Sequence, residues 1–444
     1  MSERAPAVAA VDFGASSIRV CRVELGPDAP RLSVVHRYAH SPAADGSGVL
    51  RWDWARLLAE TEKGLAAAQE AGPLASIGVD TWGVDYGLLD AHGDPVAPPV
   101  SYRDDRTAGY AAVIDRLGGA AALYDLTGVQ LVPYNTVFQV AAHDPAERDR
   151  ARHLLMLPEL VVHHLTGAVV GEPTSAGTSG LVDIRTGAWS PALAAGIGLD
   201  SAVLPDILPA GTPVGTWQGV PVHLVGGHDT AFAVAAMGAG AGSRPAFVST
   251  GTWLLVGREQ RDPDLSDAAR AANLTNEIGV LGGVRLLKNL AGGWLLEGCR
   301  PAWGDPPIRG LIEQAATVVD VPESRLDPTD ARFLHPDDML GEVTGALGLP
   351  RDTPPAVVTR VVVESLAAGT AGVLAELPGA APSDIHVFGG AQSALYRRLL
   401  ARCTGVPVHA GPAEATALGN AVVQGIALGV YHDLADARRH LGEP

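Results

Sequence analysis

Two short turns rich in small hydroxyl-bearing residues are the first features of this sequence that could do chemistry. One turn spans Asp12–Ser17 and the other spans Ser249–Thr252, and each lies between two apolar runs. A turn of small residues points several backbone N–H groups into one concave space, and such a nest binds phosphate without a lysine. Asp12 could also hold a hydrated Mg²⁺, which prefers oxygen ligands and keeps several waters. Each turn alone could be an ordinary hairpin, but the pair predicts two phosphate clamps.

A candidate general base follows a predicted buried strand at Val222–Val225. The segment Gly226–Thr230 leads into an alanine-rich helix, so Asp229 would lie near a helix N-terminus. A carboxylate there could accept the proton of a sugar hydroxyl while that oxygen attacks a γ-phosphate. Alternatively, Asp229 only caps the helix, and His228 is only a structural histidine.

Two further segments have the composition of ligand sites. The segment Asp80–Asp85 combines carboxylates, a glycine and Trp82, a set that suits a carbohydrate, although Trp82 could equally be a core residue. Gly389 and Gly390 follow a predicted strand at Ile385–Phe388. Glycines at a strand end let backbone approach a flat ligand such as adenine, although the same pattern also occurs in ordinary turns.

Several classes of protein are excluded or disfavoured. The chain has only two lysines, Lys63 and Lys288, and neither ends a GxxxxGK pattern, so a P-loop is absent. No dinucleotide fingerprint or GxSxG elbow is found. The net charge of −17 removes the usual electrostatic drive for nucleic acid binding. We therefore expect no nucleic acid partner. We also expect no membrane association, because no strongly apolar run of about 20 residues is evident.

The number of cysteines and the length of the chain indicate the cellular compartment and the number of domains. Only three cysteines occur, far apart in the sequence, so no disulfide framework is expected and a reducing cytoplasm is the predicted location. The 444 residues suffice for two or three domains. We predict two, residues 1–238 and residues 239–444, with a ligand cleft between them.

The predicted elements favour an α/β fold. A strand, a polar turn and a second strand recur at 7–23, 76–89 and 246–256, which predicts three hairpins. Apolar residues at helical spacing predict helices at 54–71, 355–377, 394–403 and 415–428. A further helix is expected at His153–His164, with Pro158 as a possible break.

Taken together and in order, the motifs resemble those of the FGGY family of carbohydrate kinases over almost the whole chain. The resemblance rests on AVDFGASSIRV at 10–20, SIGVDTWGVDYGLLD at 76–90, YRDDRT at 102–107, PYNTVFQ at 133–139, GHDTA at 227–231, STGTWLLVG at 249–257, LKNLAGGWLLE at 287–297, FGGAQ at 388–392 and GPAEATALGN at 411–420. It implies two actin-like, ribonuclease-H-like domains that close around ATP and a sugar.

The resemblance also implies roles for individual residues. Asp229 matches the catalytic base, and Asp12 would position Mg²⁺ through water. The ATP-binding positions are Ala15, Ser16, Ser17, Ile18 and Arg19 in the first phosphate turn, Thr252 in the second, and Gly390 beside the adenine. The ketose-binding positions are Gly83, His228, Asp229, Thr230 and Asn289. Two residues depart from the family pattern, Ile18 where glycine is common and Glu297 where glutamine is common.

The reaction implied is transfer of the ATP γ-phosphate to the 1-hydroxyl of a ketose, first of all L-rhamnulose. A kinase for L-fuculose, L-ribulose or xylulose is the nearest alternative. An actin-like ATPase and a sugar-sensing module without catalysis are more distant ones. The expected partners are therefore a small-molecule ketose and ATP, and the expected assembly is a monomer or a homodimer.

Overall fold

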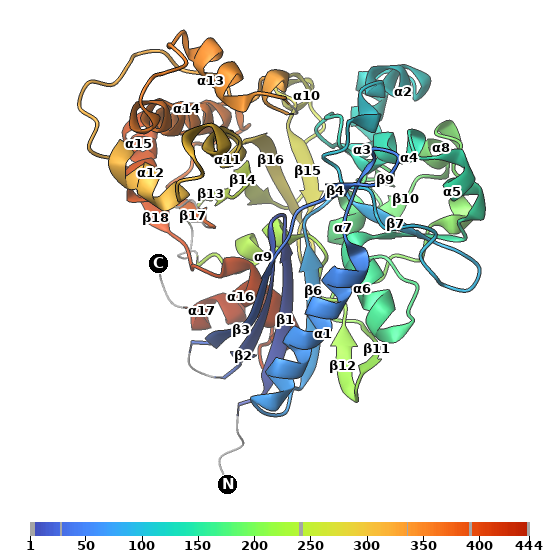
Figure 1. Cartoon of the computed structure of the whole chain (residues 1–444). Coiled ribbons are helices and arrows are strands. Elements are labelled where there is room, and N and C mark those ends of the chain that lie inside the picture. The colour runs from blue at the N-terminus through green and yellow to red at the C-terminus, as the bar shows by residue number, and fades with distance from the viewer. Residues whose placement is uncertain (1–4, 27–28, 239–242, 335, 390–392, 442–444) are drawn as a thin grey trace. The chain divides into compact units, whose positions relative to one another are not determined.

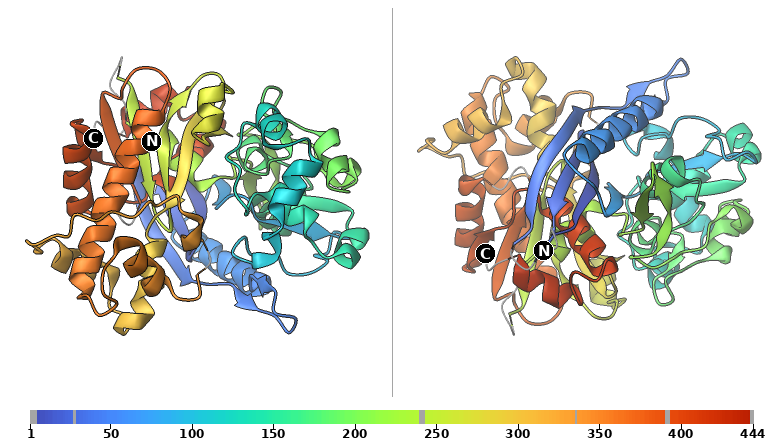
Figure 2. Two further views of the ribbon diagram at one scale, coloured as in Figure 1. Left: turned by 90° about the horizontal axis from the view of Figure 1, so that it is seen from above. Right: turned by 90° about the horizontal axis from the view of Figure 1, so that it is seen from below.

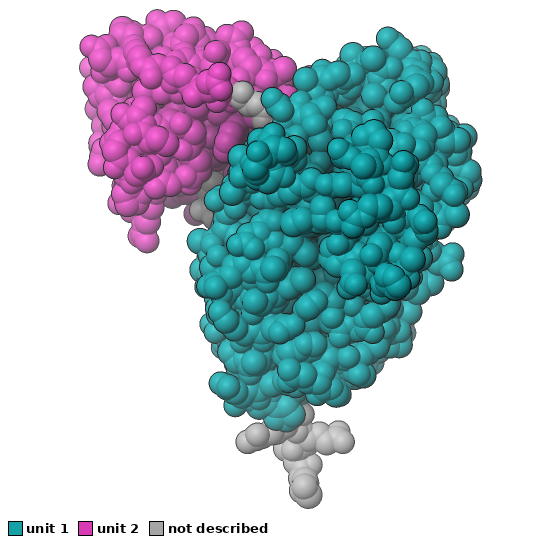
Figure 3. All heavy atoms as spheres, turned by 45° about the vertical axis from the view of Figure 1, so that its right-hand side comes forward, with its two compact units in different colours: residues 1–238, 259–285, 414–443 teal, residues 239–258, 286–413, 444 magenta. Residues whose placement is uncertain are grey.

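The computed structural model describes residues 5–26, 29–238, 243–334, 336–389 and 393–441 (Figure 1). The chain forms two compact units, coloured separately in Figure 3. Unit 1 contains residues 1–238, 259–285 and 414–443, and unit 2 contains residues 239–258, 286–413 and 444. Two segments from the second half of the chain therefore pack with the first half. The division into two domains, residues 1–238 and residues 239–444, remains a prediction from the sequence.

The centre of unit 1 is a six-stranded sheet with the strand order β11-β12-β6-β1-β2-β3. Its strands are β1 (Ala7–Gly14), β2 (Ser17–Glu24), β3 (Arg31–Ala39), β6 (Ser76–Thr81), β11 (Pro213–Trp217) and β12 (Val220–His223). β1 and β2 form the predicted antiparallel hairpin, and β6 runs parallel to β1. In this sheet β6 thus ends at the same edge as β1.

Helices cover both faces of this sheet (Figure 2). α1 (Trp54–Glu70) packs on β2 and β3, while α16 (Ala415–Ala427) packs on β1 and β6 and against α9 (Asp229–Ala235). α1 begins where predicted, because the Asp53 side chain accepts the backbone N–H of Arg56 and caps the helix. The α16 face of the sheet is lined by small apolar residues, including Val8, Ala10 and Cys21.

The second predicted hairpin, at 76–89, is wrong. β6 joins the main sheet, whereas β7 (Tyr86–Leu89) pairs with β8 (His153–Met156) in a separate two-stranded sheet. The predicted helix at 153–164 is therefore shorter, because its first turn is strand β8. α6 (Leu157–Thr166) follows at once, with Pro158 in its first turn, where a missing N–H costs nothing. Proline here begins the helix and does not break it.

A second hydrophobic core completes unit 1. It gathers residues of β7, β8, α3 (Ala120–Thr127), α4 (Thr136–Ala141) and α8 (Pro191–Gly196). The remaining helices of the unit are α2 (Tyr110–Arg116), α5 (Pro145–Arg150), α7 (Pro173–Gly177), α10 (Asp267–Ala271), α17 (Leu434–His440) and the 3₁₀ turns at 105–107 and 201–203. The short strands are β4 (Ala43–Ala44), β5 (Leu50–Arg51), β9 (Val182–Asp183), β10 (Ala188–Trp189) and β15 (Thr275–Ile278).

Unit 2 repeats the central arrangement of unit 1. Its strands follow the order β16-β14-β13-β17-β18, namely β16 (Val284–Ala291), β14 (Trp253–Gln260), β13 (Pro245–Thr250), β17 (Asp384–Phe388) and β18 (Val408–Ala410). β13 and β14 form the predicted antiparallel hairpin, and β17 is parallel to β13. Each unit therefore has a hairpin whose first strand is flanked by a parallel strand.

The helices of unit 2 are α11 (Trp294–Cys299), α12 (Ile308–Ala315), α13 (Met339–Leu347), α14 (Pro355–Glu376) and α15 (Ala394–Thr404), with 3₁₀ turns at 300–303 and 331–333. In the described part of the chain, α14 alone is long and apolar enough to cross a membrane by length and composition. However, 61% of its most apolar window is buried inside the protein. This burial, together with the Arg360–Glu364 ion pair on the helix, is typical of a core helix.

Candidate active site

Two buried aspartates meet at the shared edge of β1 and β6 in unit 1. Asp12 and Asp80 are register partners on these parallel strands, and they are 1% and 0% exposed. Side chains alternate between the faces of a sheet, so both carboxylates lie on the face that α16 covers. The Asn420 amide of α16 donates to Asp80 Oδ2 at 2.6 Å, and Gln424 donates to Asn420 Oδ1 at 2.7 Å. α16 thus fixes the Asp80 carboxylate.

The electrostatics of this pair favour a cation. Burial raises the pKa of Asp12 to about 7, an effect that Arg19 opposes and that Asp229 and Glu414 increase. Burial and the Asp12 charge likewise raise the pKa of Asp80. Asp12 Oδ1 and Asp80 Oδ1 lack a hydrogen-bond partner, whereas Asp12 Oδ2 pairs with the Arg19 guanidinium. Buried carboxylate oxygens without donors are costly, and an added positive charge would relieve that cost.

The first phosphate turn closes the β1–β2 hairpin. Ala15 and Ser16 form the loop between the paired residues Gly14 and Ser17, and neither has a positive φ. Ser16 is exposed, so the tip of this small turn is accessible to a ligand. Ile18 is an ordinary buried strand residue of β2, so the absence of glycine there does not strain the turn.

Arg19 connects this turn to the acid pair. It lies opposite Asp12 in the hairpin register, and its guanidinium is 2.5 Å from Asp12 Oδ2 and 2.6 Å from Glu414 Oε2. Glu414 also contacts Arg37 at 3.3 Å. Arg19 is therefore held between two carboxylates in the described structure, with its position set by the pleat of β2 and the start of α16.

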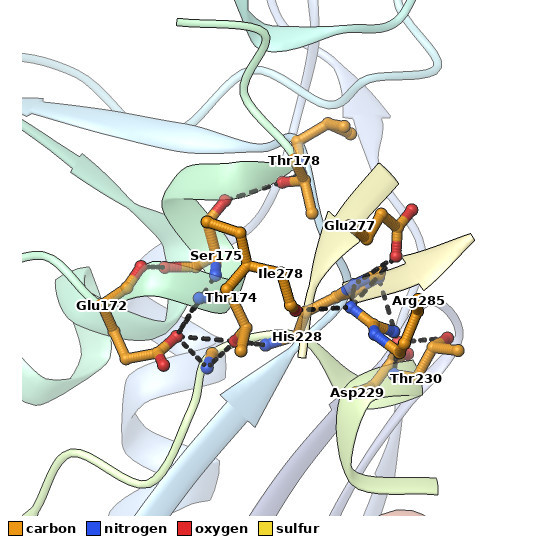
Figure 4. A network of polar contacts seen from close by, with 12 residues as sticks. Glu172, Thr174, Ser175, Thr178, His228, Asp229, Thr230, Glu277, Ile278 and Arg285 are labelled. Carbon is orange, nitrogen blue, oxygen red and sulfur yellow. Dashed lines mark hydrogen bonds and ion pairs between the residues drawn. The ribbon is translucent and has the colours of Figure 1, made fainter. Parts of the chain in front are cut away.

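The loop that carries Asp229 is fixed by a buried glutamate. Glu172 Oε2 accepts the backbone N–H of Gly227 at 2.9 Å, and the Thr174 hydroxyl accepts the N–H of His228 at 3.1 Å (Figure 4). His228 is the N-cap residue of α9, and Asp229 is its first helical residue. Asp229 Oδ1 accepts the backbone N–H of Thr230 at 2.5 Å. Asp229 therefore does not cap α9, and its side chain is 28% exposed.

The predicted sugar-binding residues fall in both units. Gly83, His228 and Thr230 belong to unit 1, whereas Asn289 lies on β16 in unit 2. Next to Gly83, the backbone N–H of Val84 donates to the Thr178 hydroxyl at 3.1 Å. A Cβ added at Gly83 would lie 3.1 Å from that same threonine. A side chain at position 83 would therefore press on Thr178 at the end of α7.

Trp82 does not offer a free aromatic face. It is 6% exposed, and its indole N–H donates to Asp85 Oδ2 at 2.9 Å. Trp52 donates to the same oxygen at 2.7 Å. Burial raises the pKa of Asp85 to about 6 despite these donors. The structure thus supports the core role of Trp82 that the sequence left open.

In unit 2 the second hydroxyl turn is braced by the segment after β16. The Thr252 carbonyl accepts the N–H groups of Gly292 at 3.2 Å and Trp294 at 3.1 Å. Gly293 donates to the Gly251 carbonyl at 2.8 Å. Glu297, where the family commonly has glutamine, pairs with Arg300 at 2.6 Å. Gly390 lies outside the described residues.

Gly389 allows a close approach of two strand ends in unit 2. Its φ is +88°, and a Cβ added there would lie 1.9 Å from the Thr250 carbonyl oxygen. We expect Gly389→Ala to destabilise the protein severely, because both the clash with backbone and the left-handed φ oppose it. Differential scanning calorimetry measures the effect. Gly405→Ala is the matched control, since its φ is +69° but nothing lies within 4 Å, and it should cost only about 1 kcal/mol. Equal effects of the two changes would contradict the steric argument.

A second buried acid supports the Asp229 loop. Glu159 of α6 accepts the Ser175 hydroxyl at 2.5 Å, and its other oxygen has no partner. Burial, together with the nearby Glu172 charge, raises the pKa of Glu159 to about 8. Glu159 is therefore protonated in the native state at neutral pH and ionised in the unfolded chain.

This difference predicts a pH-dependent stability. The native state retains a proton that the unfolded chain releases above its ordinary pKa of 4.5, so stability falls as the pH rises from 4.5 to about 8 and then levels off. Each unit of pKa difference corresponds to about 1.4 kcal/mol. We expect Glu159→Gln to gain thermal stability relative to the unmodified chain as the pH rises from 5.5 to 8.5. The exposed Glu70→Gln should show no such trend. A difference that is constant with pH would contradict the assignment.

Several of these residues were not singled out from the sequence. Asp80 was noted only for a sugar, and Glu414, Asn420, Glu277 and Arg285 were not proposed for any role. A polar residue at the end of an apolar strand was the signal for Asp80. The glutamate and arginine in β15 and β16 gave no local signal, because their partner His228 lies far away in the sequence.

The residues fit a hydrated Mg²⁺ better than a protein-ligated metal. In the part of the chain that the structure describes, no group of three or more histidine, cysteine, aspartate or glutamate side chains is placed to hold a metal ion. Asp12, however, offers one carboxylate oxygen, Oδ1, without a hydrogen-bond partner, while its Oδ2 pairs with Arg19. Mg²⁺ typically binds one or two carboxylates and keeps waters and phosphate oxygens as its other ligands. This donor set suits that chemistry.

Comparisons with solved structures define the class of fold. The xylulose kinase of Lactobacillus acidophilus matches with a TM-score of 0.80 and 15% identity, covering 98% of this chain and 92% of that one. The glycerol kinase of Plasmodium falciparum matches with a TM-score of 0.76 and 14% identity, over 99% and 92% of the two chains. The predicted α/β fold with two actin-like, ribonuclease-H-like domains is confirmed.

Sequence comparisons define the family. Models of the N-terminal and C-terminal domains of the FGGY family of carbohydrate kinases match residues 7–238 and 246–428. A rhamnulokinase of Enterobacter sp. (strain 638) is 38% identical over 97% of this chain and 91% of its own length. A rhamnulokinase of Klebsiella pneumoniae (strain 342) is 39% identical, over 94% and 88%. The chain belongs to the FGGY family of carbohydrate kinases, so it is a sugar kinase that uses ATP. An ATPase module or a sensor is not favoured.

Proposed function

We propose that this kinase transfers the γ-phosphate of ATP to the 1-hydroxyl of L-rhamnulose, giving L-rhamnulose 1-phosphate. The observation that carries the substrate is the similarity to rhamnulokinases, at 37–39% identity over 94% or more of the chain. L-Fuculose, L-ribulose and xylulose remain the ketoses against which the proposal is tested.

In the proposed reaction Asp229 accepts the proton of the sugar hydroxyl. Its carboxylate is partly exposed, and Oδ1 is held by the Thr230 N–H, so its geometry is fixed before substrate binds. His228, Thr230 and Gly83 of unit 1 and Asn289 of unit 2 are assigned to the ketose. A preorganised base contributes about 10²–10⁴-fold, while positioning and charge stabilisation account for the rest of phosphoryl transfer.

The nucleotide is assigned to the two hydroxyl turns. Ala15, Ser16, Ser17, Ile18 and Arg19 would contact its phosphates from unit 1, and Thr252 and Gly390 are the assigned positions in unit 2. Asp12 would hold Mg²⁺ through water, and Mg²⁺ supplies positive charge for the phosphate oxygens when it is bound. The unpaired Oδ1 of Asp12 supports this assignment.

An assay of ADP release tests the substrate directly. ATP and Mg²⁺ are supplied with L-rhamnulose, L-fuculose, L-ribulose, L-xylulose or D-xylulose, and with glycerol as a control that is not a ketose. We expect the highest kcat/KM on L-rhamnulose. A higher kcat/KM on another ketose would keep the kinase and refute the rhamnulose assignment. No acceleration by any of these ketoses would refute ketose phosphorylation.

We infer a cytoplasmic enzyme that acts as a monomer or a homodimer, with neither a nucleic acid nor a membrane partner. The absence of a cysteine framework in the sequence and the strongly acidic composition support this. Light scattering coupled to size-exclusion chromatography measures the assembly, and a larger oligomer would contradict it.

A further inference from the structure

A buried glutamate and a buried arginine lie against the imidazole of His228 in unit 1. Glu277 is on β15 and Arg285 is on β16, while His228 precedes α9 (Figure 4). Glu277 Oε2 is 3.2 Å from His228 Nδ1 and 3.1 Å from Arg285 Nη2. Arg285 Nη2 is itself 3.1 Å from the same Nδ1. The three groups therefore form a compact triangle on the side of the imidazole away from Nε2.

We propose that Glu277 and Arg285 are positioning residues that fix the tautomer and the orientation of His228, and so determine which hydroxyl pattern of the sugar is bound. The inference rests on the proposed function, in which His228 contacts the ketose. Neither Glu277 nor Arg285 touches substrate in this proposal, and both act through the histidine.

Burial makes this arrangement stiff. Arg285 is 1% exposed and Glu277 is 5% exposed, so neither charge is solvated. The pKa of Glu277 lies below its usual value: burial would raise it, but the charges of His228 and Arg285 outweigh that effect. Breaking a buried ion pair leaves an uncompensated charge. The carboxylate therefore stays ionised and stays in place.

Arg285 is not held by a full set of hydrogen bonds. Its Nη2 also donates to the Ile278 carbonyl at 3.3 Å, but its Nε and Nη1 have no partner among the described residues. A buried arginine with two nitrogens that lack partners is costly for stability alone. The contacts of its Nη2 converge on His228 Nδ1, Glu277 Oε2 and the Ile278 carbonyl oxygen, which indicates that Glu277 holds Arg285 against the imidazole.

The charges decide the tautomer. Arg285 can only donate, so its hydrogen bond to His228 Nδ1 at 3.1 Å requires that Nδ1 accepts. We therefore assign the proton to Nε2, which faces Asp229 Oδ1 at 3.5 Å. His228 and Asp229 together then offer a donor and an acceptor side by side. Such a pair fits adjacent sugar hydroxyls and rejects ligands that lack one of them.

A double-mutant cycle tests whether Glu277 acts through His228. The variants are Glu277→Gln, His228→Asn and the double variant, assayed with L-rhamnulose and ATP. We expect Glu277→Gln to raise the KM for the ketose about 10- to 100-fold, as expected for loss of a charged hydrogen bond, with the KM for ATP unchanged. In the His228→Asn background it should add less than about 2-fold.

Glu60→Gln is the matched control. Glu60 is also a buried glutamate that contacts a histidine, since its Oε2 is 2.8 Å from His36 Nε2, and it also pairs with Arg56 and Lys63. It lies on α1, away from the proposed residues, and should leave the KM for the ketose unchanged. Equal rises in both KM values for Glu277→Gln, or independent effects of Glu277→Gln and His228→Asn, would overturn the proposal.

A spectroscopic readout separates this inference from the proposed function. The ¹⁵N spectrum of the imidazoles, with His228 assigned from the His228→Asn variant, should show Nε2 protonated and Nδ1 unprotonated in the unmodified chain. Arg285→Lys, which keeps the charge but changes the donor geometry, should shift the Nδ1 signal and serves as the second variant if Glu277→Gln does not fold. Protonation at Nδ1 in the unmodified chain would overturn the proposal. Absence of ketose turnover by the unmodified chain would refute the proposed function, while the spectrum would still decide the tautomer.

Discussion

Replacing Asp229 with asparagine is expected to reduce kcat by about 10²–10⁴-fold, the usual contribution of a general base. The amide cannot accept the proton of the sugar hydroxyl, but its oxygen can still accept the Thr230 N–H that holds the side chain at 2.5 Å. The loop should therefore keep its shape. ADP-release kinetics measure kcat, and calorimetric titration should show that ketose and ATP still bind.

The matched control for this variant is Asp267→Asn. Asp267 is also the first residue of a helix of unit 1, α10, but its side chain is 91% exposed. The control should have unaltered kcat. A kcat close to that of the unmodified chain for Asp229→Asn would remove Asp229 from the role of base. Loss of ketose binding in that variant would show instead that Asp229 chiefly binds the sugar.

Asp12→Asn is expected to have the next largest effect, a loss of about 10- to 100-fold in activity at limiting Mg²⁺, as is typical for a residue that acts on a metal through an outer shell. The substitution replaces a buried carboxylate, whose Oδ1 lacks a hydrogen-bond partner and whose Oδ2 pairs with Arg19, with a neutral amide of the same shape. The concentration of Mg²⁺ needed for half-maximal rate should therefore rise. Titrating Mg²⁺ at fixed ATP and ketose in the ADP-release assay measures it.

Asp90→Asn provides the comparison for Asp12. Asp90 also directly follows a strand of unit 1, β7, but its carboxylate accepts the backbone N–H groups of a local turn at His92 and Asp94. Asparagine serves such turns equally well, so activity and Mg²⁺ dependence should not change. If Asp12→Asn keeps the ordinary Mg²⁺ dependence, Asp12 does not hold the ion.

Much of the fold could be predicted because its signals are local. The β1–β2 and β13–β14 hairpins were found from apolar runs on either side of a small polar turn. The helices α1 and α14 were found from the spacing of their apolar residues, within a residue or two of their observed ends. In these elements the local conformational preference of the residues agrees with the tertiary structure. Such agreement makes an element predictable from the sequence.

The errors arose where pairing depends on distant segments. The segment 76–89 has the same pattern of apolar run, polar turn and apolar run as the two observed hairpins. However, its second run, β7, pairs with β8, about 70 residues later in the chain. Likewise, the first turn predicted for the helix at 153–164 is strand β8, because pairing with β7 overrides its helical pattern. Short apolar runs cannot distinguish a strand from a buried helical turn.

By itself the sequence determined the chemistry that is available: the two hydroxyl turns, the Asp229 loop, the absence of a P-loop and, through its ordered motifs, the family. Only the tertiary structure decided which of these groups meet. The register of β1 with β6 places Asp12 beside Asp80, and Asn420 of α16 reaches them from the other end of the chain. The contact between Glu277 of β15 and His228 is a second example. Such contacts depend on strand register and burial over hundreds of residues, which no local pattern in the sequence encodes.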